Sequence, residues 1–162
     1  MQMRIEYGKV APEVYKAMMC LEQQVQKCGL ESSLLDLVKL RASQINGCAF
    51  CIDMHSKDAR ALGETEQRLY ELDAWREAPF YSEREQAALA WTEAVTLITD
   101  GHVPDQVYEE VRNQFSDIEL VNLTLAIVAI NGWNRLGIAF RAVPGSYRPV
   151  ASSTHNKPSE QE

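Results

Sequence analysis

The sequence lacks several features that would assign it to a special class of proteins. Its net charge is −7 and no basic patch stands out, so the electrostatic footprint of a nucleic-acid or anionic-membrane partner is missing. The first residues contain no apolar core followed by a small-residue cleavage site, and no signal peptide is expected. Internal repeats and low-complexity tracts are also absent. These absences predict an ordinary cytoplasmic protein, in a compartment where thiols stay reduced.

The longest apolar run, residues 118–140, is interrupted by polar and charged side chains, namely Glu119, Asn122, Asn131, Asn134 and Arg135. A membrane span tolerates such residues poorly, so the run is interpreted as a buried helix. A helix that is apolar on nearly every side is normally enclosed by other helices. In a domain this small, full enclosure is easier when a second subunit supplies part of the cover. The pattern therefore predicts a homo-oligomer.

The chain reads as helices joined by short loops, without a convincing strand. Apolar residues make up 46% and charged residues 24% of the 162 residues, which is typical of one globular domain. We expect an all-α domain of about six to seven helices over residues 1–145 and a polar, disordered tail over 146–162. The expected helices cover about 12–27, 32–46, 48–63 and 66–72, followed by helices opened by capping boxes at Ser82–Glu85 and Ser116–Glu119.

The segment from Cys48 to His55 carries the strongest chemical signal. Cys48 and Cys51 are three residues apart, and His55 follows Cys51 by four. On a helix, residues at these spacings share one face, so the three side chains converge. Such a group is either a redox dithiol with an adjacent base or three of the four ligands of a zinc site.

Thiol chemistry at neutral pH needs a thiolate. Lowering a cysteine pKa from about 8.5 to about 6.5 takes roughly 2.7 kcal/mol, whereas a helix N-terminus offers about 0.3–1 kcal/mol. A nearby imidazolium is therefore expected, and His55 is placed to supply it. Along the helix axis Cys51 lies about 6 Å from His55 and Cys48 about 10.5 Å. This favours Cys51 as the nucleophile and Cys48 as the resolving thiol.

Two alternatives compete with the redox interpretation. The cysteines can be small core residues beside a hydrogen-bonded histidine. Zinc prefers thiolate and imidazole ligands, but no second Cys/His pair exists to complete a site. The remaining cysteines, Cys20 and Cys28, are expected to be core or surface residues.

The segment Leu37–His55, which contains SQINGCAFCIDMH, resembles the core of the AhpD-like alkylhydroperoxidase family, within the carboxymuconolactone decarboxylase superfamily. The close match covers residues 33–63. The resemblance implies an all-α fold, a trimer or hexamer, and peroxidase activity without haem, flavin or metal. It implies that Cys51 attacks the hydroperoxide to give a sulfenic acid, that Cys48 condenses with it to a disulfide, and that His55 accepts the proton.

Two positions depart from the family pattern. The family has a glutamate twelve residues before the first cysteine, where this chain has Asp36. Asp36 is either part of a proton relay or a capping carboxylate. Phe50 stands where the best-known members have a relay histidine, so the proton would travel through Asp36, Glu93 or water. The polar segment 131–135 is expected to serve in packing or at an interface, with a place in the site as the alternative.

The reaction remains open at this stage, because a fold does not determine a function. The decarboxylase branch of the superfamily works without a CxxC pair, so the retained dithiol favours redox chemistry. A disulfide reductase or redox sensor is the main alternative, and a zinc protein the next. No Gly-rich nucleotide-binding loop is present. We therefore expect a dithiol electron donor, which is a lipoyl protein, a thioredoxin-like protein or a small thiol.

Overall fold

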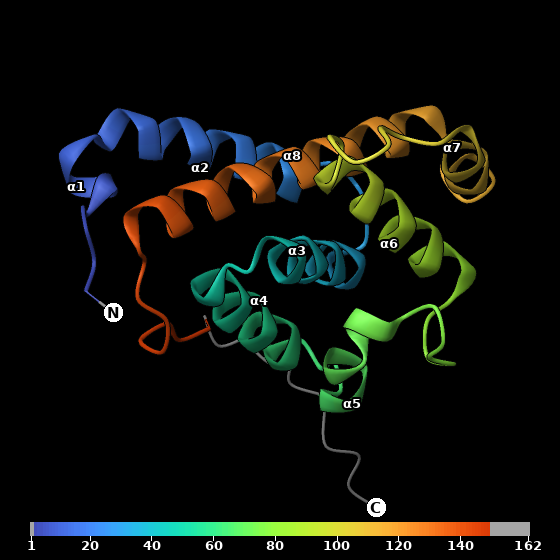
Figure 1. The fold of residues 1–162 in the computed structure, drawn as a ribbon, viewed down its shortest axis with the longest axis horizontal. Coiled ribbons are helices and arrows are strands. Elements are labelled where there is room, and N and C mark those ends of the chain that lie inside the picture. The colour runs from blue at the N-terminus through green and yellow to red at the C-terminus, as the bar shows by residue number, and fades with distance from the viewer. Residues whose placement is uncertain (1, 150–162) are drawn as a thin grey trace, which may run out of the picture.

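The longest helix, α8 (Asp117–Phe140), is the central element of the fold, which is drawn in Figure 1. The computed structural model describes residues 2–149. Within that range it contains eight α-helices, one 3₁₀ turn and no strand, which confirms the all-α prediction. The other elements are α1 (Tyr7–Val10), α2 (Pro12–Gln26), α3 (Ser32–Asn46), α4 (Ala49–Ala61), α5 (Glu66–Tyr70), the 3₁₀ turn (Leu72–Ala74), α6 (Glu83–Thr96) and α7 (Asp105–Arg112).

Local sequence signals start most of these helices. Both capping boxes form: Ser82 and Ser116 each accept from the backbone N–H three residues on, and each glutamate at that position bonds back. Pro12 occupies the first turn of α2, as expected. Serine is a preferred capping residue, and either Ser32 or Ser33 was expected to cap α3. That expectation is wrong, because Ser32 already lies inside the helix and the capping residue is Glu31, without a side-chain cap. Helix α1 was not predicted.

The turn between α3 and α4 places the first cysteine. Gly47 has a φ of 68°, a left-handed conformation that glycine adopts without steric cost. The N–H of Cys48 then donates to the carbonyl of Ser43 at 3.0 Å, and the carbonyl of Cys48 accepts from Ile52 at 2.9 Å. Cys48 is thus the N-cap of α4, and α3 and α4 form an antiparallel helical hairpin.

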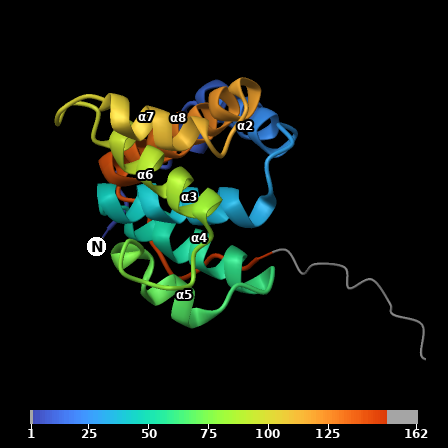
Figure 2. The ribbon, with the colours of Figure 1, turned by 90° about the vertical axis from the view of Figure 1, so that its right-hand side faces the viewer.

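The helices pack in layers around this hairpin. In Figure 1, α2 and α8 run side by side across the top, with α3 below α8 and α4 below α3. Figure 2, turned by 90°, shows the same order, with α6 packed against α3 and α8. The largest group of buried apolar residues is shared by α2, α3, α6 and α8, and includes Val25, Val38, Leu123 and Ile127. The layers leave the start of α4 facing the C-terminal half of α8.

Helix α8 is long and apolar enough to cross a membrane, with a mean hydropathy of 1.3 over its most apolar stretch. In the described structure it packs as the core helix of the domain, because it contacts α2, α3 and α6 and places Asn131 and Asn134 in the protein interior. Part of its apolar surface stays exposed: Ile118 is 75% and Val121 69% exposed.

Both ends of the described chain attach to the central helices. The backbone N–H of Arg4 donates to the carbonyl of Phe140 at 2.9 Å, and the ring of Tyr7 lies 5.8 Å from that of Phe140. At the other end, the hydroxyl of Tyr147 donates to Asp58 on α4 at 2.7 Å. Tyr147 lies in the range 146–162, which the sequence predicts as a tail, and it is bonded to α4. Residues 150–162 lie outside the described residues.

Candidate active site

The two cysteines of the CxxC pair meet at the start of α4. Both are free thiols and both are buried, with Cys48 1% and Cys51 2% exposed. The neighbouring residue on α8 is Gly137, where a Cβ would lie 3.2 Å from the sulfur of Cys48 and 3.7 Å from that of Cys51. Both sulfurs therefore lie within 4 Å of one point on the surface of α8. The predicted convergence of the pair is present, and Gly137 allows the close approach.

The two thiols have opposite electrostatic environments. The Cys51 thiol donates to the Cys48 sulfur, which is the main reason why the pKa of Cys48 falls to about 7. Burial opposes this shift, while the backbone N–H groups of Cys51 and Phe50 and the Asn134 amide add to it. The same thiol–thiol bond and burial raise the pKa of Cys51. The first proton of the reduced pair thus leaves Cys48, whereas the sequence argument expected Cys51 to be the more acidic thiol. Which sulfur attacks a substrate stays a prediction.

His55 lies one turn beyond Cys51, on the buried face of α4 that Cys51, His55 and Ala59 form. Its Nε2 has no hydrogen-bond partner among the described residues. Burial, with a smaller contribution from the nearby ammonium of Lys39, lowers the pKa of His55 to about 3. The imidazole is therefore neutral at physiological pH. It does not supply the positive charge that the sequence argument required, because its burial outweighs the benefit of a charged form. It can still accept a proton.

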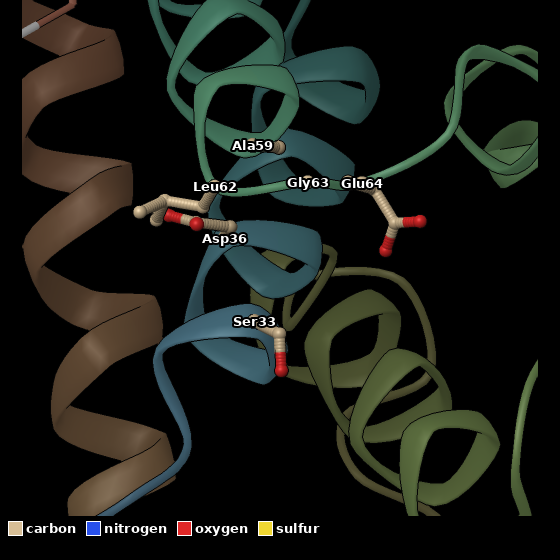
Figure 3. Close-up of a pocket in the computed structure, with 6 residues that line it drawn as sticks. All are labelled: Ser33, Asp36, Ala59, Leu62, Gly63 and Glu64. Carbon is tan, nitrogen blue, oxygen red and sulfur yellow. The ribbon is translucent and has the colours of Figure 1, made fainter. Parts of the chain in front are cut away.

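Asp36 lies on α3. It lines a cavity of about 170 Å³ with Ser33, Ala59, Leu62, Gly63 and Glu64, as Figure 3 shows. Its Oδ2 is buried and has no partner among the described residues. Burial raises the pKa of Asp36 to about 6, against the opposing effect of Lys39. No hydrogen bond joins Asp36 to His55, since neither Asp36 Oδ2 nor His55 Nε2 has a partner among the described residues.

A network of buried side-chain amides supports the pair from α8. The amide of Asn46 donates to the Oδ1 atoms of Asn131 and Asn134, both at 2.9 Å. Asn134 donates to the Ser43 hydroxyl at 3.0 Å, and Asn131 to the Thr96 hydroxyl at 3.1 Å. The sequence favours packing or interface roles for residues 131–135, with a place in the site as the alternative. The Asn134 amide lowers the pKa of both thiols, which agrees with that alternative. The available signal was the presence of two asparagines inside an otherwise apolar helix.

Glu93 does not join the pair. Its carboxylate accepts from the Trp75 indole and from Arg41, both at 2.9 Å, and pairs with Arg76 at 2.6 Å. Although burial raises the pKa of Glu93, these donors hold it below its usual range. Glu93 is therefore a structural ion-pair residue that links α6 to α3 and to the loop after the 3₁₀ turn.

The zinc alternative has no complete ligand set. Across residues 2–149, no group of three histidine, cysteine, aspartate or glutamate side chains is arranged to hold a metal ion. In particular, the imidazole of His55 is not gathered with the two sulfurs into a common coordination site. The geometry of the pair is that of a dithiol beside a base.

The comparisons with known proteins agree with this geometry. The family model of the carboxymuconolactone decarboxylase family matches residues 12–94, which include the CxxC pair, His55 and Asp36. The chain belongs to the carboxymuconolactone decarboxylase family. It is 48% identical over 139 residues to the uncharacterized protein YdfG of Bacillus subtilis, covering 86% of this chain and 95% of YdfG.

Solved structures place this family member beside AhpD-like proteins. A protein of unknown function from Agrobacterium tumefaciens, described with reference to the antioxidant defence protein AhpD, is 49% identical. It superposes with a TM-score of 0.87 over 90% of this chain and all of its own. The debrominase Bmp8 is 19% identical, with a TM-score of 0.75 over 83% of this chain and 73% of Bmp8. That likeness shows the shared fold alone.

Proposed function

We propose that the protein is a thiol-dependent peroxidase that reduces hydroperoxides through a dithiol–disulfide cycle of Cys48 and Cys51. The observation that carries the proposal is the arrangement of two free, buried thiols beside a neutral imidazole. One thiol has a pKa lowered to about 7, so a substantial fraction is thiolate at neutral pH. Similarity to an AhpD-related structure supports the same chemistry.

The reaction balances with the residues present. The thiolate of Cys51 attacks the outer peroxide oxygen, the O–O bond breaks, and the products are a sulfenic acid on Cys51 and an alkoxide that takes a proton to leave as an alcohol. The Cys48 thiol then attacks the Cys51 sulfur and displaces water, which forms the disulfide. The thiol–thiol hydrogen bond lets one proton move between the sulfurs, so Cys51 becomes the nucleophile when the proton shifts to Cys48.

His55 and Asp36 provide the proton path in this proposal. The neutral imidazole accepts the first proton that the pair loses and returns it to the leaving alkoxide, while the second proton stays on Cys48. Asp36, whose pKa is raised to about 6, exchanges protons with solvent at the cavity edge. Water connects the two groups in this proposal, because no hydrogen bond joins them and Phe50 stands where the family has a relay histidine.

A dithiol donor completes the cycle. Thiol–disulfide exchange with a lipoyl protein, a thioredoxin-like protein or a small thiol returns both cysteines to the reduced state. The reducing compartment that this cycle needs is the cytoplasm.

The decisive experiment is a stopped-flow titration of the reduced protein with hydrogen peroxide and an organic hydroperoxide, with thiols counted before and after. The Cys20→Ser/Cys28→Ser background limits the count to the pair. Loss of both thiols with one equivalent of peroxide is expected. Cys51→Ser should consume none, whereas Cys48→Ser should consume one equivalent and stop at a sulfenic acid that a dimedone probe traps. Slow thiol loss with both peroxides would reject the peroxidase.

A second candidate is disulfide exchange or redox sensing with little peroxide turnover. The observation in its favour is that both sulfurs are almost fully covered, which limits access. This function predicts reversible disulfide formation with a dithiol–disulfide buffer at a defined potential, while hydroperoxides react no faster than with a free thiol.

We also propose that the protein assembles as a trimer or hexamer through α8. Ile118, Val121, Leu125 and Val128 repeat at spacings of three, four and three residues on its outer face, a pattern typical of helix–helix seams. Val121, Leu125 and Val128 border an open groove of about 610 Å³ between α6, α7 and α8. Sedimentation that shows only monomer at micromolar concentration would reject the assembly.

A further inference from the structure

Asn134 is a polar residue in a fully buried position near the two sulfurs, and its amide therefore needs hydrogen-bond partners. It is completely buried and lies three residues before Gly137, the residue of α8 that contacts both sulfurs. Residues three apart share a helix face, so the Asn134 amide points toward the same pair. A buried amide must satisfy two N–H donors and a carbonyl acceptor.

The neighbours of Asn134 fix the orientation of its amide. Its Oδ1 accepts from Asn46 at 2.9 Å, and one N–H donates to the hydroxyl of Ser43 at 3.0 Å. The Ser43 hydroxyl donates its own hydrogen to the carbonyl of Lys39 at 2.7 Å, so it can only accept from Asn134. Rotating the amide by 180° would leave two acceptors facing each other at Ser43. The second N–H is thereby left for the sulfurs.

We propose that Asn134 is a catalytic residue whose second amide N–H donates to the thiolate of the Cys48–Cys51 pair. The chemical consequence rests on the proposed dithiol function, but the hydrogen bond itself does not. In agreement, the amide acts as a donor that lowers the pKa of both thiols.

The surroundings explain why a neutral donor is needed. The ionisable side chains around the pair are Tyr7 from α1, whose own pKa is raised by burial and by the two cysteines, and His55 on α4, which is neutral. Lys39 on α3 forms an ion pair with Glu22. No described cation is hydrogen-bonded to the sulfurs, so the backbone N–H groups at the start of α4 and the Asn134 amide stabilise the buried charge.

The test compares two asparagines that differ in one respect. Asn131 and Asn134 are both buried on α8 and both accept from Asn46, but only Asn134 faces the sulfurs. Asn134→Leu and Asn131→Leu are made in the full-length Cys20→Ser/Cys28→Ser protein. Thiolate absorbance and iodoacetamide alkylation rates are measured against pH, and thermal melts report folding.

We expect Asn134→Leu to raise the pH at which the pair loses its first proton by about one to two units, the value of a hydrogen bond to a charged group. Asn131→Leu should lower the melting temperature comparably and leave the titration unchanged. Equal titration shifts in both variants, or none in Asn134→Leu, would overturn the proposal. If Asn134→Leu does not fold, Asn134→Asp, which keeps the acceptor for Asn46, is compared with Asn131→Asp under the same criteria.

These readouts separate the two proposals. If the wild-type protein reduces no peroxide but Asn134→Leu shifts the thiol titration, the peroxidase function fails and the thiolate donor stands. If the protein is a peroxidase and the titration does not move, the assignment of Asn134 alone is wrong.

Discussion

His55 and Cys51 lie one helical turn apart on the buried face of α4, and the imidazole Nε2 next to the dithiol has no hydrogen-bond partner among residues 2–149. An unsatisfied buried nitrogen costs free energy of folding, of the order of 1–3 kcal/mol. A buried polar group that lowers stability in this way is typical of a functional site. In the proposed reaction, His55 is therefore free to accept a proton.

The first prediction concerns the pH dependence of peroxide reduction. The pKa of His55 is lowered to about 3 and that of Cys48 to about 7, so only the thiol titrates near neutrality. The second-order rate constant should therefore rise with pH through about 7. His55→Gln should lower the rate about a hundredfold without moving the midpoint. A midpoint that moves with the substitution would show that the imidazole titrates in this range.

The second prediction concerns Asp36, whose folded-state pKa is raised from 3.8 to about 6. The folded protein binds this proton more tightly than the unfolded chain does. Asp36 therefore favours folding below about pH 4, and this contribution disappears as the pH rises through 6. Asp36→Asn should be more stable than wild type above pH 6, by about 1–2 kcal/mol after allowance for solvent screening.

The same variant should separate stability from activity. Chemical denaturation between pH 4 and 8 should show the two proteins converging near pH 4. If Asp36 carries protons, Asp36→Asn should also slow peroxide reduction by about tenfold or more. A stabilised variant with full activity would leave Asp36 as a buried carboxylate without a part in the relay.

The third prediction concerns Gly137. A Cβ at this position would lie 3.2 Å from the sulfur of Cys48, so Gly137→Ala should push the pair from α8 and cost about 1–3 kcal/mol. Thiol alkylation should also slow. Gly132→Ala is the matched control on the same helix, because its Cβ would meet only the flexible end of Met18. Its thiol reactivity should be unchanged, and equal effects of both variants would contradict the model of close packing.

The fourth prediction concerns assembly. Val121→Glu places a charge in the exposed apolar stripe of α8 and should convert the oligomer to smaller species in sedimentation velocity. Val10→Glu changes another highly exposed valine, on α1, and should leave the assembly intact. Dissociation by the α1 variant alone would place the interface elsewhere.

The sequence was sufficient to predict the features that depend on neighbours along the chain. The capping boxes at Ser82 and Ser116 and the turn at Asn46–Gly47 are local signals, and the helices that they start or separate are present. The shared face of Cys48, Cys51 and His55 follows from helical spacing alone. These three side chains were therefore candidates for the site before any packing was known.

The charge states of these side chains depend on the tertiary structure. Burial depends on helices that are distant in sequence, and it turned the expected imidazolium of His55 into a neutral base. Gly137 and Asn134 reach the pair from α8, more than eighty residues later in the chain. Spacing alone cannot show which polar group of a distant helix will face a thiol. The sequence by itself placed two cysteines and a histidine at helical spacing, and the tertiary packing decided how deeply they are buried and therefore that the imidazole is neutral.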